Sequence, residues 1–269
     1  MAELIITSAS NPRLRQIAAL RRRRDRDREG LTLVDGFEEL SLALDSGVRP
    51  RTLFWCPELM SQAAAEVVER CREAGAQTLQ LSRVAFEKVA YREGPDGVLA
   101  VVPGVERTTS ELEAPPDVLA LVCQAVEKPG NLGAMLRTAD AAGVGAVIAS
   151  DPVADWGNPN LIRASKGTVF SVPVAADSTA TTLEWLRENG IALVATTPDT
   201  DLLHTDVDYT GPVAIAVGTE KTGLDDAMLT AATHRVRIPM RGRANSLNVA
   251  TSAAIVLYEA VRQRLAAGR

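Results

Sequence analysis

Three segments carry the residues whose types and spacing could do chemistry: Glu127–Thr138, Gly218–Leu224 and Ile238–Asn248. Each follows an apolar run of strand length. In open α/β sheets, ligands bind beyond the carboxyl ends of the strands, so a site is expected in these loops. The first segment offers a guanidinium, and the second places a carboxylate and an ammonium at the end of a strand. The guanidinium and the ammonium can stabilise negative charge on a bound ligand.

In the first segment, Asn131 is predicted to cap a helix that Gly143 ends. The apolar face of this helix consists of Leu132, Met135, Leu136 and Ala139. Packing does not explain Gly133 and Arg137, which lie four residues apart on another face, where the missing side chain leaves room beside the guanidinium. A solvated surface arginine is the alternative interpretation of Arg137.

The other two segments are less specific when each is taken alone. Turn chemistry would account for both Gly218 and Gly223. The third segment runs from a short strand into the last helix, for which Ser246 is a plausible N-cap. That helix carries a small-residue stripe, which indicates either core packing or a dimer face. The stripe consists of Ala250, Ala253, Ala254, Leu257 and Val261.

The elements that must position these segments alternate between strand and helix. Apolar runs predict buried parallel strands at Val118–Val122, Val144–Ala149, Ile191–Ala195, Val213–Val217 and Val236–Ile238. Helices are predicted at Leu132–Ala142, Leu161–Lys166, Thr182–Asn189, Asp226–Ala232 and Leu247–Leu265. The fold class is therefore α/β.

A smaller α/β unit precedes this region. Its strands are predicted at Leu31–Val34, Thr52–Cys56, Thr78–Leu81 and Val98–Val102, with helices after Asn11 and at Phe37–Asp45, Gln62–Ala74 and Arg83–Ala90. The stretch 103–116 lacks either hydrophobic period and is rich in Pro, Thr, Ser and Glu. We therefore expect an N-terminal domain at 1–102, a linker at 103–116 and a larger domain at 117–269.

Composition excludes several classes of protein. The 269 residues are 46% hydrophobic and 23% charged, with a net charge of −5, as in ordinary globular proteins. Three separated cysteines form no disulfide framework and favour a reducing cytoplasm. Two histidines without ligand spacing argue against a metal site. No apolar stretch predicts export or a membrane span.

Known nucleotide-binding and hydrolase motifs are also missing from the sequence. Gly143-Val-Gly145 lacks the third glycine of a dinucleotide fingerprint and precedes its strand. Neither a phosphate-binding P-loop nor a Gly-x-Ser-x-Gly nucleophile turn occurs. A nucleotide-dependent oxidoreductase is therefore disfavoured.

A basic run stands out near the N-terminus. Between Asn11 and Arg28 there are eight arginines against two aspartates, Asp25 and Asp27. The run indicates either a solvated helix end or a surface that attracts a polyanion. If it binds RNA phosphates, neutralising Arg21–Arg24 is expected to lower affinity and flatten its salt dependence.

Taken together, the three segments resemble the signature motifs of the SpoU/TrmH family of RNA ribose 2′-O-methyltransferases, of the SPOUT class. The matching letters are Asn131-Leu-Gly-x-x-x-Arg137-Thr, Gly218-Thr-Glu220-x-x-Gly223 and Ile238-Pro-Met-x-Gly242-x-x-x-Ser246-Leu-Asn248. The part from Ser8 to Val102 resembles the accessory ribosomal-protein-like, RNA-binding domain of the family. Two positions depart from the pattern: Glu127-Lys128 before Pro129, where many members have an acidic residue, and Thr219, where serine is usual.

The resemblance implies a parallel sheet with a deep trefoil knot, S-adenosylmethionine as cofactor and a homodimer formed through the catalytic domain, without a metal. It implies that the cofactor contacts Thr196, Gly218, Glu220, Ile238, Met240 and Leu247. It assigns catalysis to Arg137, Asn131, Glu220, Ser246 and Asn248. RNA contacts are expected from Arg13, Arg21, Arg22, Arg23, Arg24, Arg163 and Lys166.

The implied reaction moves a methyl group from a sulfonium to a ribose hydroxyl. Arginine is not deprotonated in proteins, so Arg137 is expected to stabilise the developing 2′-oxyanion, with Asn131 orienting it, and not to act as a general base. Where the proton goes is left open. Large-subunit (23S) ribosomal RNA is the favoured substrate, and the resemblance includes enzymes that protect antibiotic producers. Transfer RNA as substrate and a non-catalytic RNA-binding protein are the alternatives.

Overall fold

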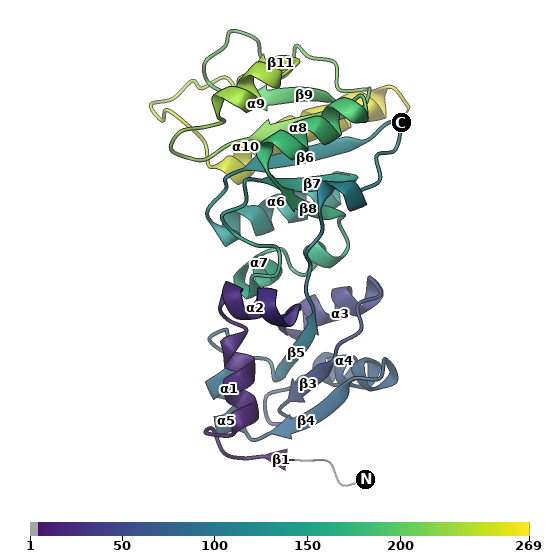
Figure 1. Cartoon of the computed structure of the whole chain (residues 1–269), viewed down its shortest axis with the longest axis vertical. Helices are drawn as coiled ribbons and strands as arrows, with labels where there is room; N and C mark the ends of the chain where they lie inside the picture. Colours follow the sequence, from purple (N-terminus) through teal and green to yellow (C-terminus); the bar gives the residue numbers. More distant parts are fainter. Residues whose placement is uncertain (1–4, 269) are drawn as a thin grey trace. The chain divides into compact units, whose positions relative to one another are not determined.

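The structure, a computed structural model, describes residues 5–268, which divide into two compact units. Unit 1 comprises the chain up to Val105 together with Trp156–Ser171, and unit 2 comprises Glu106–Asp155 and the chain from Val172 onward. Figure 1 follows the chain by colour and labels its elements. Each unit has its own sheet and its own hydrophobic core.

Unit 1 is built on sheet A, in which the strand order is β1-β4-β3-β5-β2. The strands are β1 (Ile5–Ile6), β2 (Leu31–Asp35), β3 (Thr52–Trp55), β4 (Gln77–Leu81) and β5 (Val98–Pro103), and β5 is antiparallel to both its neighbours. The helices are α1 (Pro12–Ala19), α2 (Arg23–Glu29), α3 (Phe37–Asp45), α4 (Gln62–Glu73), α5 (Arg83–Val89) and α7 (Pro159–Ala164). Buried residues of α1 and α5 join those of the strands in one core.

The helix α2 was not predicted, because its sequence, RRDRDRE, has no apolar period. Its position depends on a buried arginine, Arg26, which donates from Nη1 to the carbonyls of Leu20 (3.1 Å) and Arg21 (3.0 Å). Gly30 ends the helix in the left-handed conformation, at φ 62°. Part of the basic run is therefore structural.

The segment Trp156–Ser171 belongs to unit 1, although sequence order had placed it in the domain 117–269. Asn160 Nδ2 donates to the hydroxyl of Tyr91 at 3.2 Å, and Lys166 Nζ to Glu38 Oε2 at 2.9 Å. Gly167, at φ 83°, passes so close to Glu39 that a Cβ would lie 2.9 Å from its carbonyl oxygen. The sequence of a short helix such as α7 does not indicate which of the two units it packs in.

Glu39 is a buried carboxyl on α3, 2% exposed, and burial raises its pKa above the usual value. Because the pKa of Glu39 is higher in the folded than in the unfolded chain, the protonated carboxyl contributes its whole stabilisation at pH values below the unfolded-state pKa. This contribution is lost as the pH rises through the folded-state pKa. Glu39→Gln is therefore expected to raise the free energy of unfolding at pH 8 by on the order of 1 kcal/mol, and to change it little at pH 3. Urea denaturation at both pH values measures this. The exposed Glu66→Gln on α4 is the control, and an equal gain in both variants would contradict the assignment.

Unit 2 is built on sheet B, whose strand order is β11-β9-β10-β6-β7-β8 and whose pairings are all parallel. The strands are β6 (Leu119–Gln124), β7 (Ala146–Ser150), β8 (Val174–Asp177), β9 (Ala192–Thr196), β10 (Val213–Val217) and β11 (His234–Val236). The helices are α6 (Pro129–Ala141), α8 (Thr179–Glu188), α9 (Asp226–Ala231) and α10 (Val249–Ala266).

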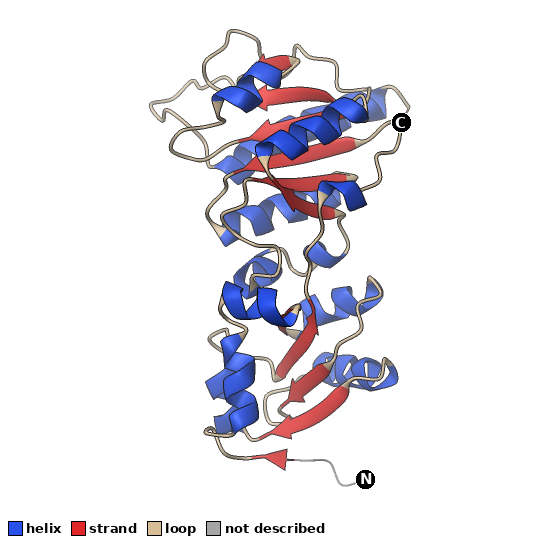
Figure 2. Cartoon of the chain, in the orientation of Figure 1, coloured by secondary structure: helices blue, strands red, loops and turns tan. Residues whose placement is uncertain are grey.

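Helices cover both faces of sheet B (Figure 2). Residues of one face, such as Val122 and Ala216, share a core with Trp185 of α8 and Met228 of α9. The alternate residue Cys123 points to the other face, where its Sγ lies 3.8 Å from the sulfur of Met135 on α6. Within residues 5–268, no helix combines the length and apolar character needed to cross a membrane.

The predicted strands that correspond to β6, β7, β9 and β10 are confirmed, whereas the strand predicted at Val236–Ile238 shares only Val236 with β11. Two predicted caps are wrong. Helix α6 starts earlier than expected: Lys128 is its N-cap and Pro129 its first residue, because proline suits the first turn of a helix. The N-cap of α10 is Asn248, whose side chain accepts from the backbone of Ala250, and not Ser246. Strand β8 was missed because its sequence, VAAD, is too short to show a period.

Candidate active site

The carboxyl ends of neighbouring strands bring the three motif segments to one edge of sheet B. In the register, Val217 pairs with Cys123 of β6, and Thr196 pairs with Val236 of β11. Because all these strands are parallel, the chain leaves β6, β9, β10 and β11 at the same edge. The loops that begin there contain the residues that the sequence analysis singled out.

The loop after β10 is a tight turn that only glycine permits at its first position. A Cβ on Gly218 would lie 2.1 Å from the carbonyl carbon of Gly223. Reciprocal backbone hydrogen bonds of 3.0 and 3.1 Å join Thr219 and Gly223, and the Thr219 hydroxyl accepts from the Thr222 amide at 2.9 Å. Thr219 therefore supplies the hydroxyl that the usual serine would, and the turn presents Glu220 at its tip.

Glu220 is the centre of a polar cluster drawn from three parts of the sequence. Its Oε1 accepts from Asn131 Nδ2 at 2.9 Å and from Asn248 Nδ2 at 3.1 Å, and Asn248 Nδ2 also contacts Asn131 Oδ1 at 3.2 Å. Lys128 forms an ion pair with Glu220 Oε2. We call these four residues the Glu220 cluster. It joins the start of α6, the loop after β10 and the N-cap of α10.

A cavity of about 190 Å³ adjoins the Glu220 cluster, with Gly218, Thr219 and Val249 also in its lining. Hydrogen bonds from Lys128 and Asn131 hold the pKa of Glu220 below its usual value. Glu220 therefore remains a carboxylate at neutral pH. In this form it accepts hydrogen bonds from two amides and pairs with one ammonium.

The ion pair predicts a measurable shift at Glu220. Lys128→Gln is expected to raise the pKa of the Glu220 carboxyl toward its ordinary value, because the largest lowering influence is removed. A carbon-13 NMR titration of the glutamate carboxyls measures this. Lys221→Gln removes the same charge from the neighbouring, exposed residue and serves as control. An unchanged Glu220 titration in Lys128→Gln would show that the ion pair does not form in solution.

Arg137 lies apart from the Glu220 cluster within the single chain. It is exposed on α6, six residues after Asn131, so the two side chains point about 120° apart around the helix axis. The Arg137 side chain makes no hydrogen bond or ion pair with any residue from 5 to 268, which leaves its guanidinium available to a ligand. The expectation that Asn131 orients Arg137 is not met, because the Asn131 amide is engaged by Glu220 and Asn248.

The residues expected to contact a cofactor lie along the same edge. Thr196 ends β9 and donates from Oγ1 to the carbonyl of Ala216 at 2.7 Å, while Ile238 follows β11 and is half-buried. Met240, 38% exposed, and the half-buried Leu247 lie in the loop between β11 and α10. Ser246, in the same loop, is exposed and has no hydrogen bond to the described residues.

Comparison with known proteins identifies the family. A model of the SpoU rRNA Methylase family matches residues 118–258, and a model of the MRM3-like substrate binding domain matches residues 11–100. The 23S rRNA (uridine(2479)-2′-O)-methyltransferase of Streptomyces viridochromogenes is 34% identical over 266 residues, which cover 96% of this chain and 92% of the relative. The chain belongs to the SpoU rRNA methylase family.

Solved structures of SpoU relatives match the fold over nearly the whole chain. A crystal structure titled RNA 2′-O ribose methyltransferase superposes with a TM-score of 0.86 at 41% identity, over 97% of this chain and 100% of that one. The SpoU methyltransferase AviRb from Streptomyces viridochromogenes, in complex with the cofactor AdoMet, superposes with a TM-score of 0.86 at 33% identity, over 95% and 100%. The resemblance of the motifs to the SpoU/TrmH family and the α/β fold are thus confirmed.

Sequence reasoning missed two polar residues at this edge of sheet B. Lys128 was noted only as a departure from the family pattern, although it pairs with Glu220. Gln124, buried at the end of β6, donates to the Thr179 hydroxyl at 2.8 Å and accepts from the Asp225 amide at 2.9 Å. It thereby ties the starts of α8 and α9 to the strand. A polar residue that closes an apolar run was the signal that could have found it.

The arginines expected to bind RNA fall into two groups. Arg21 donates to the carbonyls of Val89 and Ala90 at 3.0 and 2.8 Å, and Arg22 pairs with Asp25 at 2.8 Å. Arg23 lies 3.7 Å from Asp27, while Arg163 and Lys166 contact Asn160 and Glu38. Arg13 and Arg24 are exposed and have no side-chain partner among residues 5–268. These last two are the most available to phosphates.

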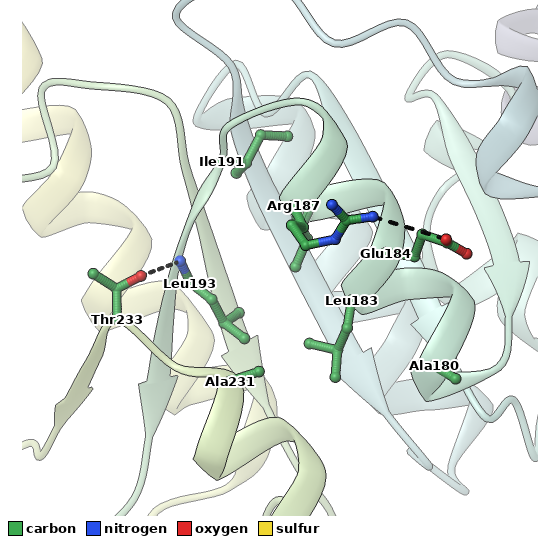
Figure 3. A pocket seen from close by; sticks show the side chains of 9 residues that line it. Ala180, Leu183, Glu184, Arg187, Ile191, Leu193, Ala231 and Thr233 are labelled. Carbon is green, nitrogen blue, oxygen red and sulfur yellow. Dashed lines mark hydrogen bonds and ion pairs between the residues drawn. The ribbon is translucent and has the colours of Figure 1, made fainter.

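Other features of unit 2 do not suit catalysis. A cavity of about 570 Å³ lies between α8 and the β9–α9 region and is lined mainly by apolar side chains such as Leu183, Ile191 and Leu193 (Figure 3). Burial raises the pKa of the Cys123 thiol to about 12, so it is not a nucleophile at neutral pH. Within the described part of the chain, no group of three or more His, Cys, Asp or Glu residues could hold a metal.

Proposed function

We propose that this SpoU protein transfers a methyl group from S-adenosylmethionine to a ribose 2′-hydroxyl of large-subunit ribosomal RNA. The observation that carries the proposal is the Glu220 cluster, which holds all three motif segments together at one edge of sheet B. The match of both parts of the chain to models of the methylase and of its substrate-binding domain supports ribosomal RNA over transfer RNA.

The residues at this edge fit S-adenosylmethionine. Gly218 keeps the turn tight beside the cavity that it lines, and Ile238, Met240 and Leu247 offer apolar surface for an adenine ring. Thr196 and Glu220 supply polar groups beside them. These residues would hold the cofactor, which supplies the electrophilic methyl group when bound. The Glu220 cluster adds a carboxylate paired with an ammonium, and two oriented amides, to the site.

Arg137 is proposed to act on the RNA side of the reaction. A guanidinium stays charged at all working pH values and offers several N–H donors, which suit a phosphate and a developing oxyanion. Since no described residue engages it, Arg137 can bind substrate without breaking an existing contact. Asn131, Ser246 and Asn248 are assigned to positioning the loops around the reacting groups.

Unit 1 is proposed to bind the RNA substrate. Arg13 and Arg24 attract phosphates, and Arg163 and Lys166 lie on exposed positions of the segment that unit 1 gains from the later chain. This assignment agrees with the substrate-binding model that matches residues 11–100.

We also propose a homodimer formed through the catalytic domain and a trefoil knot near the C-terminus. Tyr258 and Leu265 on α10 are 49% and 69% exposed, which gives this helix apolar surface that a second copy would cover. Light scattering of the purified chain measures the oligomeric state.

The free, buried cysteines Cys56, Cys71 and Cys123 support a reducing cytoplasm as the location.

Transfer of radiolabelled methyl from S-adenosylmethionine tests the proposed substrate. Unmethylated large-subunit ribosomal RNA and bulk transfer RNA are offered separately. Label in ribosomal RNA is the expected result. Label in transfer RNA alone would contradict the proposed substrate but support the proposed methyl transfer. Label in neither would favour the RNA-binding protein without turnover. A role in antibiotic resistance stays a prediction, tested by the drug sensitivity of a susceptible bacterium that expresses the protein.

A further inference from the structure

We propose that a groove in unit 1 receives one unpaired nucleotide of the RNA, with its base against an apolar floor and its phosphate at an arginine rim. The groove lies between α1 and the strands β3 and β4, has a volume of about 520 Å³, and is called here the α1–β3 groove. The proposal rests on the proposed function, because it takes RNA to be the ligand.

The floor of the α1–β3 groove is apolar. It is formed by Phe54, Leu79 and Val101, which project from three neighbouring strands of sheet A and are 3%, 3% and 6% exposed. The half-buried Leu31 adds to one side. An apolar floor suits an unstacked base, because proteins bind single-stranded bases by packing their faces against side chains.

The rim carries polar side chains that the fold does not use. Arg13 and Gln16 project from α1, and Arg51 and Gln77 from the starts of β3 and β4; all four are exposed and line the groove. None of their side chains makes a hydrogen bond or ion pair with another of the described residues. Glutamine amides read the hydrogen-bonding edge of a base, and arginines bind phosphate, so the rim supplies both types of contact.

The net charge of the rim is positive. Asp25 and Glu29 also line the groove, but Arg28 pairs with both of them, at 3.2 and 3.0 Å, which offsets one of their two negative charges. Arg22 pairs with Asp25 as well, at 2.8 Å. Arg13 and Arg51 are left without a counter-charge. The volume also falls in the range of about 300–1,000 Å³ that is usual for small-ligand sites.

The test compares two double variants of the full chain. Arg13→Gln/Arg51→Gln removes two charges from the rim, and Arg15→Gln/Arg49→Gln removes two charges from exposed neighbours that do not line the groove. Methyl NMR signals of Ile17, Leu79 and Val101 are followed while the hexaribonucleotides rA6, rC6 and rU6, and an abasic hexamer, are added. The same preparations are assayed for methyl transfer to ribosomal RNA.

We expect at least one hexamer to shift these methyl signals, the abasic hexamer to leave them unchanged, and the rim variant to weaken binding about 10-fold more than its control. No shift with any hexamer, equal shifts with the abasic strand, or equal losses in both variants would overturn the proposal. The methyl-transfer assay distinguishes failure of this proposal from failure of the proposed function. Methyl transfer without NMR shifts would reject only nucleotide binding in the groove. NMR shifts without methyl transfer would reject only the proposed reaction.

Discussion

Arg137→Ala is expected to lower kcat for methyl transfer by about 10²–10³-fold, the usual cost of removing one donor that stabilises an oxyanion. Affinity for S-adenosylmethionine should stay unchanged, because Arg137 points about 120° away from Asn131 around α6 and lies outside the lining of the cavity beside the Glu220 cluster. Single-turnover methyl transfer and calorimetric titration of the cofactor measure the two quantities. Folding should be unaffected, since Arg137 is exposed and unpaired within the described residues.

Two further variants define the reason for this loss. Arg137→Lys keeps the charge but loses the fork of N–H donors, so a partial rate is expected. Arg187→Ala removes an exposed arginine of α8, whose side chain is 72% exposed, and should leave the rate unchanged. Substantial methylation by Arg137→Ala would show that Arg137 does not take part in the reaction. The group that stabilises the oxyanion would then have to be a residue other than Arg137.

Gly218→Ala is expected to lower both cofactor affinity and stability. The added Cβ would lie 2.1 Å from the carbonyl carbon and 2.2 Å from the oxygen of Gly223, and backbone on both sides of the turn must shift to admit it. Overpacking of this kind costs about 1–3 kcal/mol. The displaced turn carries Glu220, so binding of S-adenosylmethionine should weaken at least about 10-fold. Thermal unfolding and cofactor titration test these outcomes.

Gly211 provides a matched control for this substitution. It precedes the same strand, β10, and a Cβ at this position would meet no atom within 4 Å. Gly211→Ala should therefore leave cofactor affinity unchanged and alter stability by less than about 1 kcal/mol. Equal effects at Gly211 and Gly218 would mean that general loss of glycine freedom, and not the tight turn, explains the result.

The parallel core of unit 2 was predictable because its strands are buried on both faces and so form nearly continuous apolar runs. Val213–Val217 was predicted with its observed ends, and the common edge of the site followed from the parallel direction of its neighbours. Strand β1 and helix α2 were not predictable in this way: one has two residues and the other lacks any apolar residue.

The contacts of the site were less predictable than its location. The motif letters indicated Asn131, Glu220 and Asn248, but Lys128 and Glu220 stand 92 residues apart, and only the folded chain brings them together. Likewise, asparagine is a common N-cap residue, but α6 already begins at Pro129. The side-chain amide of Asn131 is therefore not used as a cap and donates to Glu220. Arg21 showed the reverse: its charge indicated RNA binding, while two carbonyls and the ring of Tyr91 engage it.

Methylation at the ribose 2′-oxygen is the central claim, and nucleoside analysis of the product tests it most directly. Large-subunit ribosomal RNA is incubated with the protein and S-adenosylmethionine, digested to nucleosides and examined by mass spectrometry, with Arg137→Ala in parallel. We expect one additional 2′-O-methylnucleoside with the natural chain and none with the variant. A methyl group on a base, or equal product from both proteins, would contradict the account.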